Sequence, residues 1–264
     1  MKVGRTLRVV YEIGCHVEEI LLEGRQATGV RTTRGDFHAP VVVNAAGPWC
    51  YLLPEAVGGR VTTAAVAHYN LITRPIDQRP IERLCPVVRD RHHRIYARPE
   101  SGGLLVGMYE EDPVVYQMGK LPADFDMQAL KAGRDEVNVA ELIYLAGQRF
   151  PWINERTPMT MVKGLMSFTP DSQPLCGPMP DFEGLYHCCG MSGRGIVQSP
   201  TVGVIMAELI VEGTSRYDVA SVTADRFFDD PGFRERPAIE ERCRQMYARI
   251  YGGLEKAEPA SQQP

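Results

Sequence analysis

The sequence predicts a protein of mixed class, in which an α/β part is joined to an α+β part with a mostly antiparallel sheet. Two observations carry this prediction. Near the C-terminal end, an apolar run at 185–189 leads through a glycine-rich turn at 190–196 into a helical pattern at 199–213. Between 50 and 159, short strand-like runs alternate with prolines and charges before one long helical pattern begins.

The chain is predicted to leave its first domain and then return to it. Residues 1–49 and 160–215 form the first domain, residues 50–159 form the second, and residues 216–264 form a C-terminal helix and a polar tail. The composition changes at both boundaries, from apolar strand-like runs to sequence rich in proline and charge, and back again.

Bulk composition excludes several classes of protein. With 264 residues and a net charge of −4, the chain shows no basic footprint of the kind that binds nucleic acid. No apolar run approaches the roughly 20 residues that span a membrane. Met1–Thr6 lacks the apolar core of a secretion signal. We therefore expect a cytoplasmic protein.

The first domain is predicted to begin with a β-meander. Strand-like runs at 17–22, at 27–33 and from 37 onward are separated by glycine-containing turns. The next run, 41–47, is apolar on both faces, as in the middle of a parallel sheet, and ends in small residues. These small residues leave room for a flat or bulky group above the strand, or they allow tight packing against the next helix.

The second domain is predicted from strands at 64–73, 95–98 and 104–109 and from a helix at 127–150. The mixture of short strands with one long helix is typical of an α+β domain.

The chain is then predicted to return to the first domain through a strand at 161–168. Gly213 ends the helix that follows the glycine-rich turn. A last helix is predicted at 238–250, and the polar tail 255–264 is expected to be disordered.

The turn Gly190–Ile196 is a candidate binding element. Glycine lets the backbone approach a ligand closely. The N-terminus of the following helix presents free N–H groups and a partial positive charge. The target would be a phosphate, a carboxylate or the electron-rich edge of a ring. The alternative is a tight strand-to-helix connection that binds nothing.

No metal site is predicted. The seven cysteines are irregularly spaced and include no C-x-x-C. Cys188–Cys189 falls in a predicted buried strand, where both residues would be small core side chains. The pair His92–His93 lies in a predicted loop and is not expected to bind a metal.

Three stretches, in their order and spacing, carry a resemblance to a known family. They are Val42–Trp49, Phe168–Gly177, and Gly184–Leu185 followed by Gly190–Ile196 and Ser199–Pro200. Over about residues 8–230, the chain resembles the FAD-dependent amine and amino-acid oxidoreductases of the D-amino-acid-oxidase superfamily.

A further set of stretches is similar to the dimethylglycine and sarcosine dehydrogenase group and the related β subunit of sarcosine oxidase. These stretches are His68–Thr73, Pro86–Asp90, Tyr96–Arg98 and Gly103–Glu110. The resemblance implies FAD as the cofactor, held by a Rossmann-like domain with a β-meander. This domain is incomplete, because the sequence contains no G-x-G-x-x-G for the pyrophosphate. The chain is therefore expected to be the C-terminal part of such an enzyme, with another segment or subunit supplying the rest.

The resemblance assigns one group of residues to the region beneath the cofactor. Val17 matches a position whose backbone meets the adenine, although it could be a plain strand residue. Ala45, Ala46 and Gly47 match the strand end that passes under the cofactor. Trp49 matches a position near the flavin, and a core tryptophan is the alternative.

A second group matches the turn that faces the pyrimidine edge of the flavin: Gly190, Ser192, Gly193, Gly195 and Ile196. Hydride transfer leaves negative charge on that edge, and preorganised backbone donors would stabilise it. The resemblance thus favours the ligand-binding interpretation of this turn.

His68 and Tyr96 match polar residues over the flavin face. Amine oxidation needs a neutral amine, and a histidine can accept the ammonium proton or hold the amine in place. A tyrosine hydroxyl can orient the amine or a carboxylate. Arg98, two residues after Tyr96 on the same strand face, could bind a substrate carboxylate. The alternatives are a hydrogen-bonded strand histidine, a packed tyrosine and a surface salt bridge.

Two departures from the single-domain sarcosine oxidases favour the dehydrogenase or β-subunit branch. Gly164 stands where those enzymes carry a flavin-linking cysteine, and Val197 stands where they carry a substrate-binding lysine. These two absences leave the substrate open. In the family a tyrosine more often lies two residues after the histidine, whereas here Tyr69 is adjacent to His68 and Asn70 takes that place.

The predicted function is oxidation of the C–N bond of a secondary or tertiary amine, such as a sarcosine-like or dimethylglycine-like N-methyl amino acid, by hydride transfer to FAD. The imine formed would then hydrolyse. The alternative is a non-catalytic fragment or partner subunit that cannot bind FAD alone. Neither a nucleic-acid nor a membrane partner is expected.

Overall fold

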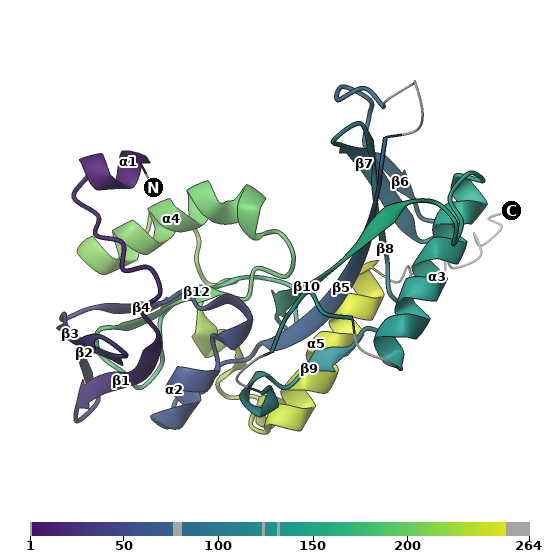
Figure 1. Ribbon diagram of the computed structural model, residues 1–264. Helices are drawn as coiled ribbons and strands as arrows, with labels where there is room; N and C mark the ends of the chain where they lie inside the picture. Colours follow the sequence, from purple (N-terminus) through teal and green to yellow (C-terminus); the bar gives the residue numbers. More distant parts are fainter. Residues whose placement is uncertain (1, 76–80, 123–124, 131–132, 252–264) are drawn as a thin grey trace, which may run out of the picture.

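The computed structural model describes residues 2–75, 81–122, 125–130 and 133–251, and its strands form three sheets (Figure 1). The predicted mixture of α/β structure with antiparallel sheet is confirmed. The helices are α1 (Lys2–Thr6), α2 (Leu52–Ala56), α3 (Arg134–Arg149), α4 (Gly195–Val211) and α5 (Arg236–Tyr251). Short 3-10 helices are η1 (Gly47–Trp49), η2 (Met118–Lys120), η3 (Ala224–Phe227) and η4 (Pro231–Phe233).

The largest sheet has six strands, and all of its strand pairs are antiparallel. Its strands are β5 (Ala64–Thr73), β6 (Val88–Asp90), β7 (Ile95–Glu100), β8 (Gly103–Met108), β9 (Val115–Tyr116) and β10 (Met159–Phe168). The order is β10-β5-β8-β7-β6, and β9 also pairs with β5. Strand β10 thus lies in the same sheet as strands of the predicted second domain, and the division of the chain into domains stays a prediction.

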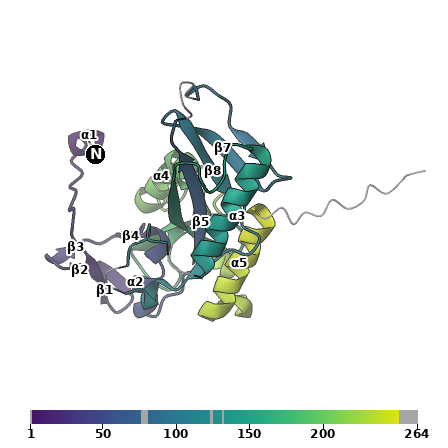
Figure 2. The ribbon, with the colours of Figure 1, turned by 45° about the vertical axis from the view of Figure 1, so that its right-hand side comes forward.

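Strands β5 and β10 pair without interruption from Ala64–Phe168 to Thr73–Met159. Side chains alternate across a strand, so β5 presents two different faces. Tyr69 points to the side of α3, where its hydroxyl contacts Asp135. His68 points to the other side, where it meets Tyr247 of α5. Figures 1 and 2 show β5 beside both helices.

Helix α3 begins at Arg134, and the predicted start at 127 is wrong. Gly133 precedes the helix with a φ of 88°, a left-handed conformation that ends helical backbone on its N-terminal side. From there the helix buries Leu142, Leu145 and Ala146 against the large sheet. The predicted tail 255–264 lies outside the described residues.

Two smaller sheets make up the rest of the β structure. The predicted meander is confirmed as β1 (Val17–Glu23), β2 (Gln26–Thr32) and β3 (Gly35–His38), paired antiparallel. The other sheet contains β4 (Val42–Asn44), β11 (Leu175–Pro178) and β12 (Leu185–Cys189). Strand β12 pairs parallel with β4. Among the described residues β4 has no second neighbour, and Val43 is exposed.

Helix α4 begins directly after the glycine turn, at Gly195 rather than at the predicted Ser199. Ser199–Pro200 resembles a helix start because proline is favoured in the first turn. In the structure the Ser199 hydroxyl instead donates to the Ile196 carbonyl within the helix, at 2.9 Å. The helix ends at Val211, and Gly213 follows with a φ of 74°, as predicted for its stop.

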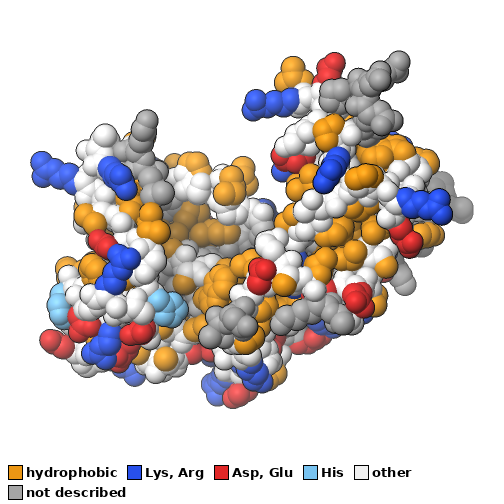
Figure 3. Space-filling view, viewed as in Figure 1, with side chains coloured by type: hydrophobic (Ala, Val, Ile, Leu, Met, Phe, Trp, Pro, Cys, Tyr) orange, Lys and Arg blue, Asp and Glu red, His pale blue; other side chains and the backbone are white. Residues whose placement is uncertain are grey.

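The face seen in Figure 3 is hollowed between the side that carries α1 and α4 and the side that carries β6 and β7. Within the described ranges, none of the helices combines the length and the apolar character that crossing a membrane requires.

Candidate functional site

The glycine turn before α4 has a backbone that only small residues support. Gly190, Ser192 and Gly193 all have positive φ angles, of 65°, 48° and 78°. A Cβ at Gly190 would lie 2.7 Å from the Thr169 methyl group, which is too close. The Ser192 N–H donates to the Ser167 carbonyl at 2.9 Å, so the turn is tied to the end of β10.

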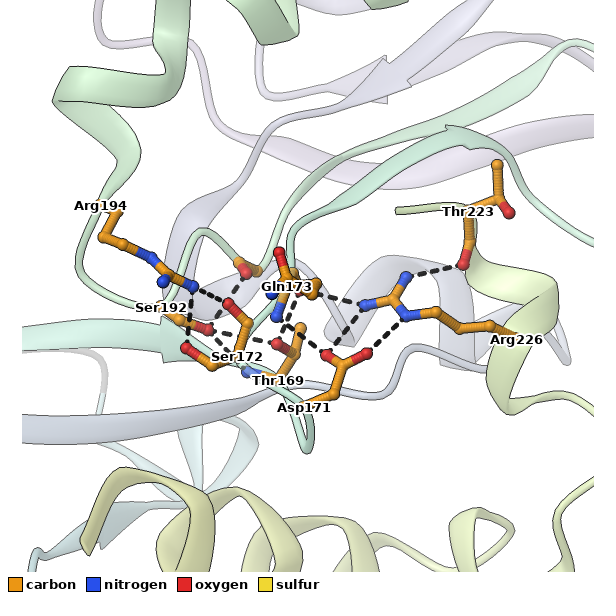
Figure 4. A network of polar contacts seen from close by, with 9 residues as sticks. Thr169, Asp171, Ser172, Gln173, Ser192, Arg194, Thr223 and Arg226 are labelled. Atoms are coloured by element: carbon orange, nitrogen blue, oxygen red, sulfur yellow. Dashed lines mark hydrogen bonds and ion pairs between the residues drawn. The ribbon is translucent and has the colours of Figure 1, made fainter. Parts of the chain in front are cut away.

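A polar network holds the turn in place (Figure 4). The Thr169 N–H donates to Ser192 Oγ at 3.2 Å, and Arg194 Nη2 donates to Ser172 Oγ at 2.9 Å. On the other side, Arg226 forms an ion pair with Asp171 at 2.8 Å. Ser192 and Arg194 therefore anchor the start of α4 to the 169–173 segment, and Arg226 ties that segment to η3.

The N-terminus of α4 is open to solvent. The Ile196 side chain is 93% exposed. The described part of the chain provides no backbone acceptor for the amides of Gly195, Ile196 and Val197, which begin the helix. These N–H groups and the helix dipole can stabilise an electron-rich group that binds at this end of the helix.

Three of the predicted cofactor residues line one cavity of about 700 Å³. Its lining is His16, Val17, Glu18, Ala46, Trp49, Leu52 and Leu53. Asn44 shapes the loop on one side, because its amide donates to the Cys50 carbonyl at 2.6 Å and its Oδ1 accepts from the Ala46 N–H at 3.3 Å. Trp49 is 39% exposed, so it is not a core tryptophan.

His68 and Tyr96 lie in direct contact. His68 Nε2 is 2.9 Å from the Tyr96 hydroxyl, and the two rings stack with centroids 5.8 Å apart. The Tyr96 hydroxyl donates to Asn70 Oδ1 at 2.7 Å. Asn70, which departs from the family pattern in sequence, is thus the third member of this polar chain.

Glu110 and Tyr247 complete the cluster, and sequence reasoning missed both. Glu110 is 1% exposed, and its Oε2 lies 3.0 Å from His68 Nδ1. Its Oε1 accepts from the Tyr69 N–H at 2.8 Å. The Tyr247 hydroxyl contacts His68 Nδ1 at 2.9 Å and also donates to Glu110. Glu110 ends one of the stretches that carry the resemblance, whereas Tyr247 has no comparable signal.

Gly107 makes room for the Tyr96 ring. The two residues are partners across β7 and β8, and a Cβ at Gly107 would overlap that ring. Burial, and then the negative charge of Glu110, raise the pKa of Tyr96. The hydroxyl therefore stays protonated and remains a hydrogen-bond donor at all physiological pH values.

Arg98 is not part of this cluster. It forms an ion pair with Glu100 at 2.5 Å on the surface of β7, and its role in substrate binding stays a prediction.

Tyr251 lies between the glycine turn and the histidine cluster. A Cβ at Gly193 would be 2.7 Å from the Tyr251 hydroxyl and 2.8 Å from the Met166 sulfur. The Tyr251 ring stacks on Tyr247 at 4.8 Å and lies 6.2 Å from the His68 ring. The turn and the His68–Tyr96 pair are therefore neighbours, and one tyrosine of α5 fills the space between them.

The sequence with this fold belongs to a family of flavoenzymes. The sequence pattern of the family described as FAD dependent oxidoreductase (DAO) matches residues 4–209, more than half of the chain. The chain belongs to this family, whose cofactor is FAD, and the predicted resemblance is confirmed.

The particular relatives agree with the branch that the sequence indicates. The chain is 29% identical to mitochondrial sarcosine dehydrogenase of Homo sapiens over 228 residues, covering 86% of this chain and 24% of that protein. It is 27% identical to 4-methylaminobutanoate oxidase (formaldehyde-forming) of Paenarthrobacter nicotinovorans over 235 residues, covering 89% of this chain and 28% of that protein.

A solved structure supports the fold. L-proline dehydrogenase from P. horikoshii superimposes with a TM-score of 0.66 at 24% identity, over 81% of this chain and 54% of that one. The chain thus spans about a quarter of the curated relatives and about half of the solved one.

The described residues fit part of an FAD molecule. The cavity at Val17, Ala46 and Trp49 has apolar walls suited to a flat ring system, and the amides at the start of α4 suit the electron-rich edge of the flavin. The pyrophosphate normally lies on a G-x-G-x-x-G turn, which this sequence does not contain. The individual assignments of the cofactor residues stay predictions.

Proposed function

We propose that the protein oxidises the C–N bond of a secondary or tertiary amine, such as an N-methyl amino acid. The observation that carries this proposal is the contact of His68 with Tyr96, 2.9 Å apart, backed by the buried Glu110 carboxylate. Relatives that are named sarcosine dehydrogenase and 4-methylaminobutanoate oxidase support an N-methylated substrate.

The hydrogen-bond network suits a histidine that takes up a proton. Glu110, as a carboxylate, can only accept, so His68 Nδ1 donates to it. A second proton on Nε2 would be donated to the Tyr96 oxygen, whose own proton goes to Asn70. Both ring nitrogens of His68 would therefore still have a hydrogen-bond acceptor after the ring has taken the ammonium proton and left the amine neutral.

A neutral amine is the reactive form, because its lone pair drives the loss of hydride from the adjacent carbon. FAD, when bound, supplies the acceptor for that hydride. Tyr96, held protonated and backed by Gly107, would orient the amine or a carboxylate. Gly193, Gly195 and Ile196 would hold the flavin edge with their backbone donors.

The test is anaerobic reduction of the FAD-loaded protein by sarcosine or dimethylglycine, followed through the loss of the flavin's visible absorbance. We expect His68→Ala to slow this reduction by about 100-fold or more, as for removal of a general base. We expect the exposed His92→Ala to leave the rate unchanged.

Two results would argue against the proposal. Equal rates in wild type and His68→Ala would remove the role assigned to the histidine. Protein that stays colourless after incubation with FAD would support the alternative, a non-catalytic fragment or partner subunit.

A further inference from the structure

Three arginines, two at the end of β6 and one at the start of α4, line one pocket beside the His68–Tyr96 pair. The pocket has a volume of about 210 Å³ and is lined by Arg89, Arg91, Tyr109, Arg194, Ile250 and Tyr251. Arg89 lies on β6, directly opposite Tyr96 on β7. The Tyr109 ring lies 5.7 Å from the Tyr96 ring. The pocket therefore shares a wall of tyrosine rings with the site proposed to hold the amine.

The positive charge of this pocket is not neutralised by its own lining, which includes no carboxylate. Within the described ranges, the side chains of Arg89 and Arg91 form neither a hydrogen bond nor an ion pair. Arg194 is fixed to Ser172 through Nη2 (Figure 4), while its buried Nε finds no partner among the described residues. By contrast, Arg94, in the connection between β6 and β7, forms an ion pair with Glu141 at 2.6 Å.

The arginines act on the same space. All three arginines line the same pocket as Tyr251. Burial raises the pKa of Tyr251, and the charges of Arg194 and Arg89 oppose that shift. Like charges held near one another repel, and an anion bound between them relieves the repulsion. One carboxylate neutralises one guanidinium and leaves two uncompensated, whereas a dianion leaves only one. Guanidinium forks are also suited to planar or tetrahedral oxyanions.

We propose that this pocket binds a small dianionic group, the acidic end of a substrate that carries two negative charges. The statement that this group belongs to the amine substrate rests on the proposed function, but binding of the dianion by the pocket does not. Either a pair of carboxylates or a single phosphate would supply the two negative charges.

The test is calorimetric titration of the 264-residue chain at low salt with malonate, inorganic phosphate and acetate. We expect malonate or phosphate to bind at least about tenfold more tightly than acetate. If malonate binds most tightly, the substrate is a dicarboxylic one. If phosphate binds most tightly, the substrate is a phosphorylated one. Acetate binding as tightly as both dianions, or no binding of any anion, would overturn the proposal.

Variants locate the binding. We expect the double variant Arg89→Gln with Arg91→Gln to weaken the preferred dianion by at least about tenfold. Both side chains are exposed and unpaired in the described structure, so folding should not depend on them. Arg83→Gln, an exposed arginine outside the pocket, is the matched control. An equal loss in the control and in the pocket variant would overturn the proposal. None of these measurements involves flavin, so their failure is distinct from a failure of amine oxidation.

Discussion

At the residue scale, the site depends on how one imidazole is held. His68 has Glu110 and Tyr247 at Nδ1 and Tyr96 at Nε2. Glu110 is itself fixed by the Tyr69 backbone N–H, which belongs to the residue next to His68. The Glu110 carboxylate is therefore a positioning residue. It orients the imidazole through Nδ1, whereas Nε2 faces Tyr96.

Glu110→Gln tests that role. The amide keeps the volume but loses the charge, so His68 can no longer donate to a carboxylate. A charged hydrogen bond stabilises by about 1.5–3 kcal/mol, so we expect flavin reduction by the amine to slow by about 10- to 100-fold. Glu111→Gln changes the exposed neighbour and serves as the control.

Affinity for the flavin should stay unchanged in Glu110→Gln, since the carboxylate contacts His68, Tyr247 and the Tyr69 N–H and none of the predicted cofactor residues. A variant that reduces its flavin at the wild-type rate would contradict the positioning role. The rates are measured by stopped-flow absorbance.

At the scale of elements, a buried ion pair joins β10 to α3. Lys163 is 0% exposed, and its Nζ lies 2.8 Å from Asp135 Oδ2 and 3.0 Å from the Tyr116 hydroxyl. Asp135 also accepts from the Tyr69 hydroxyl. The strand residue opposite Lys163 is Tyr69, so one network ties two strands and a helix together on the side of β5 opposite to His68.

We expect Lys163→Met to lower the free energy of unfolding by about 3–5 kcal/mol, because removing one partner breaks the buried Lys163–Asp135 ion pair. Urea unfolding of the chain measures this. Adding Asp135→Asn to the same variant should restore part of the loss. The exposed Lys120→Met is the control, and a loss in the control as large as that in Lys163→Met would contradict the explanation.

Elements were easier to predict than their limits or their contacts. The strand at 64–73 and the meander follow from apolar alternation and turn residues, and both were predicted. The predicted start of α3 is wrong because Gly133 interrupts an apparently helical pattern. The predicted start of α4 is wrong because Pro200 is typical of a first helical turn but lies inside this helix. Tyr247 was missed because it lies 179 residues from His68 in sequence, a distance at which no local pattern carries information.

At the scale of the whole molecule, acid should weaken the fold through His187. This β12 residue is 0% exposed, and neither ring nitrogen has a partner among the described residues. Burial lowers the pKa of His187 from 6.5 to about 4. Its strand neighbours on the same face, Leu185 and Cys189, belong to two different hydrophobic clusters, so the imidazole lies where the two cores meet.

The sign of the effect follows from the two protonation states. As pH falls through 6.5, the unfolded chain takes up a proton that the folded chain refuses until about pH 4. Stability is therefore lost over that interval, by up to about 3 kcal/mol from this group. We expect His187→Leu to show a shallower fall of the unfolding free energy between these pH values, while the exposed His92→Leu keeps the wild-type slope. Identical slopes in all three proteins would contradict this assignment.

The unbroken pairing of β5 with β10 has a consequence for motion. His68 sits inside that ladder, whereas Tyr247 and Tyr251 approach it from a helix at the far end of the chain. Backbone amides in the ladder should exchange with deuterium slowly, and those of α5 faster. We thus expect the site to open when α5 moves away from the sheet, while His68 stays in place and β5 stays paired with β10.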